Sequence, residues 1–235
     1  VYKYICSENT SPYYNLALER SLFDFVDEDT VILFLWQNSH TIVIGKNQNA
    51  YAECKVDEFI KDGGTLARRP SGGGAVYHDL GNLNFSIICK DSIAKEHTYQ
   101  RIVKEALSYF GIVSEFNGRN DLTVDDKKFS GNAFYVKDDV LCQHGTILIN
   151  SDFKELSKYL TPDISKLERN HVKSVESRVV NLSEISDKIT VESMKEAMIK
   201  ATNAVSIDEI PEGSKVEEYK KIFENDEWIL EGKGL

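Results

Sequence analysis

The spacing of apolar residues divides the first part of the chain into short elements. Leu18 and Leu22 belong to an apolar set with helical spacing, so residues 15–26 are predicted to form an amphipathic helix. Residues 31–36 and 41–45 are apolar, short and rich in β-branched side chains, with polar turn residues between them. This pattern predicts two neighbouring strands.

Further strands and helices follow from the same patterns. The additional predicted strands are residues 65–69, 74–78, 83–90, 121–136 (with an internal turn) and 145–150. The additional predicted helices are residues 96–110 (stopped by Gly111), 151–160, 190–205 and 214–223. In the helix at 190–205 the expected buried stripe is Val191, Met194, Met198 and Ala201.

The order of these elements predicts the fold class. Strands dominate the first part of the chain and helices the last part, so we expect an α+β protein without regular βαβ alternation. Near the end, Trp228, Ile229 and Leu230 precede a glycine-spaced tail. We expect these three residues to form an exposed apolar patch that docks an accessory domain or a partner chain.

Composition excludes several classes of protein. The chain has 235 residues and a formal net charge of −10, which argues against a general nucleic-acid binder. No apolar run approaches the roughly 20 residues that span a membrane. The cysteines, Cys6, Cys54, Cys89 and Cys142, show no C-x-x-C spacing, which is typical of reduced thiols and predicts a cytoplasmic protein.

The stretch RRPSGGGAVYHDLGNLNFS, residues 68–86, concentrates polar chemistry around three glycines. It does not match a P-loop or a dinucleotide fingerprint. It is either a hairpin turn or a cradle whose backbone amides, from Gly72 to Ala75, approach an anionic ligand closely. Arg68 and Arg69 precede it on a predicted strand, so only one of them is expected to point at the ligand.

A second polar stretch is GRNDLTVDDKKFSGNAFY, residues 118–135. Asn120 and Asp121 offer oxygen atoms of the kind that Mg²⁺ accepts, and Lys128 lies on a strand edge. The sequence QHGT places His144 at the start of another strand. Taken alone, these turns are most often solvated loops, and an isolated histidine is most often structural.

These motifs together resemble the lipoate-protein ligase A family. The resemblance runs from NLALE through RRPSGGGAVYHDLGN, GRNDLTVDDKKFSGNAFY, HGTILIN and SVESRVVNL to DEWILEGKG. It implies a biotinyl/lipoyl-transferase-like fold, related to class II synthetases, with a mixed β-sheet flanked by helices. It also implies that lipoate is activated with ATP and Mg²⁺ to lipoyl-AMP, and that the lipoyl group then passes to a lysine of a carrier domain.

The resemblance also assigns roles to residues. Lys128 corresponds to the catalytic lysine that contacts both the lipoyl carbonyl and the phosphate. The adenylate site is expected at Arg69, Gly74, Ala75, Val76, Tyr77 and Lys128. The lipoate site is expected at Ser71, Gly72, Gly73, His78, Asn82, Lys128 and His144. Asp121 is the expected metal ligand.

Partners and domain organisation follow from the same resemblance. The expected carriers are the glycine-cleavage H protein and the E2 subunits of 2-oxoacid dehydrogenases, with no nucleic acid and no membrane. Residues 1–235 are expected to form the catalytic domain without the C-terminal accessory domain of two-domain members.

Two alternatives remain open. An acyltransferase of the same fold would need no ATP and would carry the acyl group on a cysteine thioester. Cys142 lies two residues before His144, which on a strand puts both side chains on one face. A small buried thiol is the simpler interpretation of Cys142. The other alternative is a non-catalytic subunit that binds lipoate without turnover.

Overall fold

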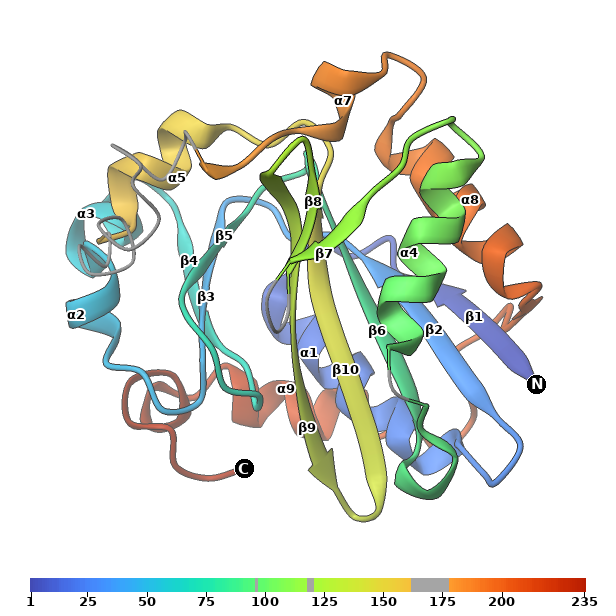
Figure 1. The fold of residues 1–235 in the computed structure, drawn as a ribbon. Coiled ribbons are helices and arrows are strands. Elements are labelled where there is room, and N and C mark those ends of the chain that lie inside the picture. The colour runs from blue at the N-terminus through green and yellow to red at the C-terminus, as the bar shows by residue number, and fades with distance from the viewer. Residues whose placement is uncertain (96, 118–120, 162–177) are drawn as a thin grey trace.

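Two β-sheets form the centre of the computed structural model, which describes residues 1–95, 97–117, 121–161 and 178–235 (Figure 1). The larger sheet has the spatial order β11 Val205–Ser206, β1 Tyr2–Cys6, β2 Val31–Trp36, β6 Asn82–Lys90, β10 Val140–Leu148, β9 Lys127–Lys137, β8 Asp121–Val124 and β7 Glu115–Asn117. The smaller sheet has the order β4 Thr65–Arg68, β3 Thr41–Ile44 and β5 Val76–His78. Strand β1 pairs parallel with both neighbours and the other pairs of the larger sheet are antiparallel, so that sheet is mixed.

Helices cover both faces of the larger sheet. One face carries α1 Pro12–Ser21, a 3₁₀ turn at Leu22–Phe25 and α9 Val216–Phe223, and the other carries α4 Thr98–Ser108 and α8 Val191–Thr202. The remaining helical segments are α2 Ala50–Glu53, α3 Val56–Lys61, a 3₁₀ turn at Asp91–Ile93, α5 Phe153–Tyr159, α7 Leu182–Ile185 and a π-helical turn at Glu227–Glu231. The predicted α+β class, a mixed sheet flanked by helices, is confirmed.

Side-chain alternation along β6 separates an apolar face from a polar one. Leu83 and Phe85 point toward α4, where Phe85 stacks on Tyr99 with ring centroids 5.2 Å apart. The intervening residues Asn84 and Ser86 are buried on the opposite face, toward α1. The sheet therefore presents buried polar groups to α1. Because burying a polar group without a hydrogen bond is costly, these groups need partners from the protein or from a ligand.

Several element ends differ from the sequence prediction. Helix α1 begins at Pro12, three residues earlier than predicted, because proline is well suited to the first turn of a helix. Strand β10 begins at Val140, five residues before the predicted start at residue 145. Helix α8 ends at Thr202 because Asn203 takes a left-handed φ of 49°, and Val205 therefore belongs to β11. Of the predicted stripe on α8, Met194 and Met198 are fully buried.

The predicted apolar patch near the end of the chain is wrong. Trp228 and Ile229 are buried, with 1% and 5% of their surface exposed, and only Leu230 is exposed. The Trp228 indole packs edge-on against Phe223 and its Nε1 donates a 2.9 Å hydrogen bond to the carbonyl of Arg68. The segment therefore packs against β4 of its own chain and offers no apolar docking surface at Trp228.

Parts of two predicted motifs lie outside the described residues. These are residues 118–120 of the GRNDLTVDDKKFSGNAFY motif, which include Asn120, and residues 174–177 of the SVESRVVNL motif. Within the described residues, each helix is too short or too polar to span a membrane.

Candidate active site

The glycine-rich stretch forms a loop, residues 69–75, between β4 and β5. The predicted strands at 65–69 and 74–78 are shorter than expected, so the loop is longer. Gly73 has a φ of +96°, a region that favours glycine, while a Cβ on Gly72 or Gly74 would point into open space. The loop lies against the end of β3, because a Cβ on Gly45 would lie 2.3 Å from the Gly73 carbonyl oxygen. Its position depends on glycines at two separate places in the chain.

The two arginines before the loop point in different directions, and both are buried. Arg68 donates hydrogen bonds to the carbonyls of Gly45, Lys46, Gln48, Ile229 and Leu230, at 2.8 to 3.0 Å. Burial lowers the pKa of Arg68. Arg68 therefore joins the chain near residue 46 to the segment near residue 229.

Arg69 instead holds the glycine loop. Its guanidinium donates to the carbonyls of Val43, Gly72 and Gly74, at 3.1, 2.8 and 2.7 Å. Its Nε also donates to Ser71 Oγ at 3.1 Å. Burial lowers the pKa of Arg69 to about 10, and the guanidinium stays charged at neutral pH. Most of its donors are used by the loop, so Arg69 fixes the loop backbone.

Ser71 connects the loop to the larger sheet. Its Oγ lies 2.6 Å from His144 Nε2, and His144 Nδ1 lies 2.8 Å from Glu19 Oε1. The Ser71, His144 and Glu19 side chains are all buried. The predicted residues Arg69, Ser71 and His144 are thus brought together, whereas Glu19 on α1 was not predicted. Other polar residues of α1, Asn15 and Arg20, are buried too, so the sequence position of Glu19 carried no distinct signal.

His78 and Asn82 are also buried, and His78 lies close enough to Arg69 and His144 for their charges to act on it. The pKa of His78 is lowered to about 3 because burial disfavours its charged form, and Arg69 and His144 act in the same direction. Its Nδ1 lies 3.2 Å from Asn38 Nδ2, and its Nε2 has no hydrogen-bond partner among the described residues. Asn82 donates to Asn84 at 2.9 Å, and within the same part of the chain Asn82 Oδ1 has no partner either. These buried, unpartnered atoms are available to a polar ligand atom or to water.

The backbone of β5 forms one edge of the smaller sheet. Val76 and Tyr77 pair with β3 on one side, and β5 is the outer strand of the smaller sheet. The Tyr77 hydroxyl turns away to His40, at 3.1 Å, and burial raises the pKa of Tyr77. Ala75 is partly buried against the core. The backbone from Gly74 to Tyr77, and not the tyrosine hydroxyl, is what this edge offers.

Lys128 and Asp121 form a separate polar pair on β9 and β8. Lys128 Nζ lies 2.8 Å from Asp121 Oδ1, and the two side chains are 38% and 35% exposed. Gly131 makes room for this pair, because a Cβ there would lie 2.7 Å from Lys128 Nζ. The same strand reaches the glycine loop, since a Cβ on Gly73 would lie 4.0 Å from that of Ala133. The lysine and the loop therefore belong to neighbouring surfaces.

Cys142 is fully buried on β10. Burial raises the pKa of its thiol well above the usual value, and the charge of Glu19 adds to this effect. A thioester-forming cysteine needs a lowered pKa and access to substrate. The geometry supports the simpler interpretation of Cys142 as a buried apolar residue.

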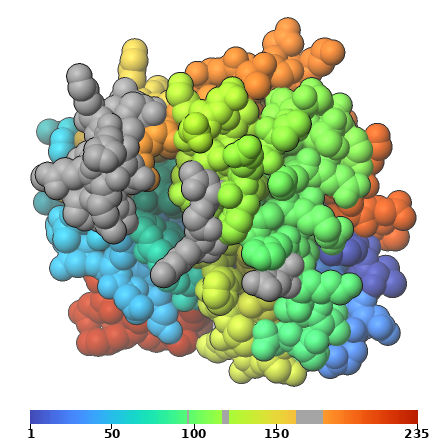
Figure 2. Space-filling model, in the orientation of Figure 1, coloured from blue at the N-terminus to red at the C-terminus, as the bar shows by residue number. Residues whose placement is uncertain are grey.

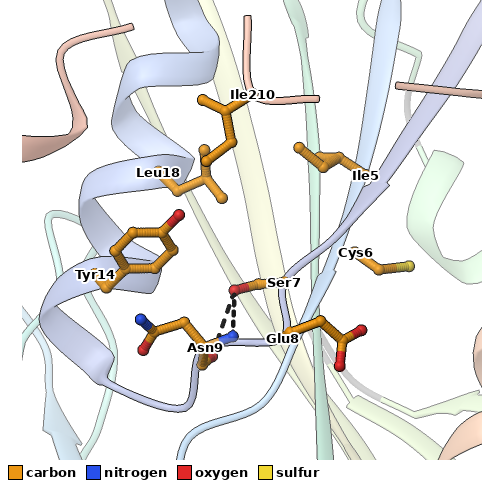
Figure 3. A pocket seen from close by; sticks show the side chains of 8 residues that line it. All are labelled: Ile5, Cys6, Ser7, Glu8, Asn9, Tyr14, Leu18 and Ile210. Atoms are coloured by element: carbon orange, nitrogen blue, oxygen red, sulfur yellow. Dashed lines mark hydrogen bonds between the residues drawn. The ribbon is translucent and has the colours of Figure 1, made fainter. Parts of the chain in front are cut away.

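The molecule has a hollow on one face and a separate pocket elsewhere. Figure 2 shows a hollow between the cyan helices α2 and α3 and the yellow-green strands β8 and β9. A pocket of about 400 Å³ lies elsewhere, between β1 and α1 (Figure 3). Its lining contains none of the predicted residues, and its polar part is a local turn in which the Ser7 hydroxyl and Asn9 backbone bond each other. We therefore take the glycine loop with Lys128 and Asp121 as the candidate site.

Comparisons with known proteins identify relatives of this chain by sequence and by fold. Residues 11–203 match the family described as the lipoyl protein ligase A/B catalytic domain. Lipoate-protein ligase A of Psychrobacter cryohalolentis is 44% identical over 192 residues, which cover 82% of this chain but only 57% of that protein. The crystal structure of Plasmodium falciparum LipL1 in complex with lipoate superposes with a TM-score of 0.83 at 34% identity, covering 100% of this chain and 75% of that one. A lipoate-protein ligase A bound with ATP, 24% identical, has the same fold, with a TM-score of 0.78 and coverage of 97% of each chain.

Proposed function

Because this chain belongs to the lipoyl protein ligase A/B catalytic-domain family, we propose that it is an ATP-dependent lipoate-protein ligase. Its fold is the expected biotinyl/lipoyl-transferase-like, class II synthetase-like arrangement. The chain spans little more than half the length of the P. cryohalolentis relative, so activity, substrates and partners belong to the proposal.

The observation that carries this proposal is the glycine loop beside the outer strand β5 of the smaller sheet. Gly72 and Gly74 leave open space over the backbone, and Arg69 holds the carbonyls of the same loop. The loop amides are then free to face an anion, since amide N–H groups of successive residues bind anions well. The adjoining edge of β5, from Gly74 to Tyr77, offers backbone groups to an adenylate.

The proposed chemistry has two steps. In the first, a lipoate carboxylate oxygen attacks the α-phosphorus of ATP, the bond to the β-phosphate oxygen breaks, and lipoyl-AMP and pyrophosphate form. In the second, the ε-amine of a carrier lysine attacks the lipoyl carbonyl carbon. The acyl–phosphate bond breaks, AMP leaves, and the amine loses a proton as the amide forms.

Lys128 offsets the charge that the first step gathers. Carboxylate and triphosphate are both anionic, so a cation placed between them stabilises the transition state more than the separated substrates. Lys128 is a partly exposed cation on β9, and its ion pair with Asp121 is weak because both side chains are partly exposed. Lys128 can therefore exchange this contact for contacts to the substrates.

Asp121 fits the requirements for a magnesium ligand. Mg²⁺ commonly uses one or two protein carboxylates and completes its shell with water and substrate phosphates. Asp121 provides one half-exposed carboxylate next to Lys128, which is enough on the protein side. Bound Mg²⁺ would neutralise phosphate charge at this position.

The assay of pyrophosphate release tests the proposal directly. The chain is mixed with lipoate, ATP and Mg²⁺, and pyrophosphate and lipoyl-AMP are measured with and without an apo carrier domain. Lipoate-dependent pyrophosphate release supports the ligase. Transfer from an acyl thioester or acylated donor carrier without ATP supports the acyltransferase, and lipoate binding with neither reaction supports the non-catalytic subunit.

Carrier, domain and location complete the proposal. The glycine-cleavage H protein and E2 lipoyl domains are the proposed carriers, and residues 1–235 are proposed to form the catalytic domain. We propose a cytoplasmic location, which suits the four free cysteines.

A further inference from the structure

A chain of buried hydrogen bonds runs from the core of the larger sheet to the glycine loop. Trp36 Nε1 donates to Ser86 Oγ at 3.0 Å, and Ser86 Oγ donates to Glu19 Oε1 at 2.5 Å. The same oxygen of Glu19 meets His144 Nδ1 at 2.8 Å, and His144 Nε2 meets Ser71 Oγ at 2.6 Å. All five side chains are buried, with Glu19 completely so. The chain therefore continues through protein alone from Trp36 to the loop.

The Trp36 donor at one end and the Glu19 carboxylate in the middle set the direction of the bonds in this chain. The Trp36 indole can only donate, so the Ser86 hydroxyl accepts from it and gives its own hydrogen to Glu19. At the other end, Ser71 Oγ accepts from the Arg69 Nε–H, and its own hydrogen can go to His144 Nε2, at 2.6 Å, or to the Gly72 carbonyl, at 3.4 Å. The two runs of donors converge on Glu19 Oε1, which accepts from both.

Glu19 also decides which nitrogen of His144 carries the proton. A carboxylate oxygen only accepts, so His144 Nδ1 must be the donor in this pair. In a neutral imidazole Nε2 is then an acceptor, and the Ser71 hydroxyl donates to it. Without an acceptor at Glu19, the proton would favour Nε2. The bond to Ser71 would then reverse: Oγ would accept from Nε2–H, and the Ser71 hydrogen would turn to the Gly72 carbonyl of the loop.

We propose that Glu19 is the positioning residue of the glycine loop: it holds His144 as the Nδ1–H tautomer, and His144 thereby anchors Ser71 and the loop backbone that follows. The loop role rests on the proposed function, in which the loop faces the acyl-adenylate. Glu19 itself acts through His144 and Ser71 and does not touch the substrate.

The surroundings of Glu19 favour this role over metal binding. Glu19, Cys142 and His144 offer ligand atoms within 4.8 Å of one another, a spacing that a metal ion could use. Both nitrogens of His144 are already engaged, by Glu19 and by Ser71. Arg69 is the nearby cation that balances the buried carboxylate, since Glu19 and Arg69 interact electrostatically. A metal would have to displace bonds that connect the loop to the sheet.

The test compares two substitutions at Glu19 with a control on the same helix. Glu19→Leu removes the acceptor at similar volume, and Glu19→Gln keeps an amide oxygen for both donors. Leu18→Ala is the control, because it removes a buried side chain of α1 that takes no part in the hydrogen-bond chain. Thermal unfolding shows how much each change destabilises the protein.

Two readouts decide the outcome. Long-range ¹H–¹⁵N spectra of the histidine rings, recorded without substrate, should show Nδ1–H at His144 in the parent and in Glu19→Gln, and Nε2–H in Glu19→Leu. Calorimetry with a non-hydrolysable lipoyl-AMP analogue should give affinity weakened on the order of 10- to 100-fold in Glu19→Leu, the range for losing one bond to a charged group. Glu19→Gln should recover most of it, and Leu18→Ala should keep the parent affinity and tautomer.

The positioning role is overturned if Glu19→Leu keeps the Nδ1–H tautomer or the parent affinity, or if Leu18→Ala weakens affinity equally. Failure of the proposed function appears differently. The parent would then release no pyrophosphate and bind no analogue, while the tautomer would still change in Glu19→Leu.

Discussion

Replacing Lys128 by alanine separates a catalytic role from a structural one. Lys128 and Asp121 are each more than a third exposed, so their ion pair contributes only about 0–1 kcal/mol to folding. A loss of that size lowers the melting temperature of a chain this long by less than about 4 °C. Removing a cation from the developing charge at phosphorus costs on the order of 3 kcal/mol in the transition state. At 1.36 kcal/mol per tenfold, that is a roughly 150-fold slower formation of lipoyl-AMP.

The assay measures pyrophosphate release from lipoate, ATP and Mg²⁺ in single-turnover conditions, alongside thermal unfolding. Lys127→Ala is the matched control, since Lys127 is the adjacent residue of β9 and its side chain is exposed. We expect Lys127→Ala to keep the parent rate. The assignment of Lys128 is refuted if Lys128→Ala forms lipoyl-AMP at the parent rate, or if both alanine variants lose activity equally. Equal loss would indicate a general attraction of anions to this strand.

Three further predictions follow from individual groups of the site. Gly73→Ala should reduce the free energy of unfolding by about 1–3 kcal/mol in urea titrations, because φ is +96° there, while Gly72→Ala should change it little; equal effects would contradict the strain argument. Cys142→Ala should retain lipoyl-AMP formation and carrier lipoylation, measured by mass spectrometry of the carrier, since the thiol is buried and its pKa is raised; loss of transfer alone would favour the thioester route. His78 has a pKa of about 3 when folded and about 6.5 when unfolded, so unfolding takes up a proton between these values and stability falls as pH drops below 6.5, by up to about 1.4 kcal/mol per pH unit. His78→Gln should flatten that slope in urea titrations at pH 4.5 to 7, and an unchanged slope would show that His78 does not titrate as its burial requires.

The sequence predicts local structure and single motifs better than it predicts contacts between distant segments. The periodic spacing on α4 and the β-branched runs of β2 and β3 are local signals, and they identified the elements correctly. The glycine loop was recognisable because three successive glycines cost backbone entropy on folding, so a folded chain keeps them where the backbone conformation or a close approach needs them. The ends of elements were less accurate, as at Pro12 and Val140, because capping and strand pairing decide them.

The contacts that could not be predicted join residues that are far apart in the sequence. Glu19 lies in an ordinary helical pattern, and only the fold brings it to His144, 125 residues later. Trp228 was predicted to be exposed because its neighbours in sequence are polar and glycine-rich. Its burial comes from β4, which lies 160 residues earlier and gives no local signal.

The bonds of Arg68 have a consequence for the order in which the protein matures on the ribosome. Three of its acceptors lie within residues 45–48, but the carbonyls of Ile229 and Leu230 are made about 160 residues later. At roughly 5–20 residues per second, the nascent chain waits on the order of 10 to 30 seconds for them. Throughout that interval the Arg68 guanidinium lacks two of the carbonyls that accept its hydrogen bonds. Because burying a charge without its partners is costly, β4 and the glycine loop are favoured to stay hydrated until then. The proposed adenylate surface would therefore be completed late, after the larger sheet has had time to assemble.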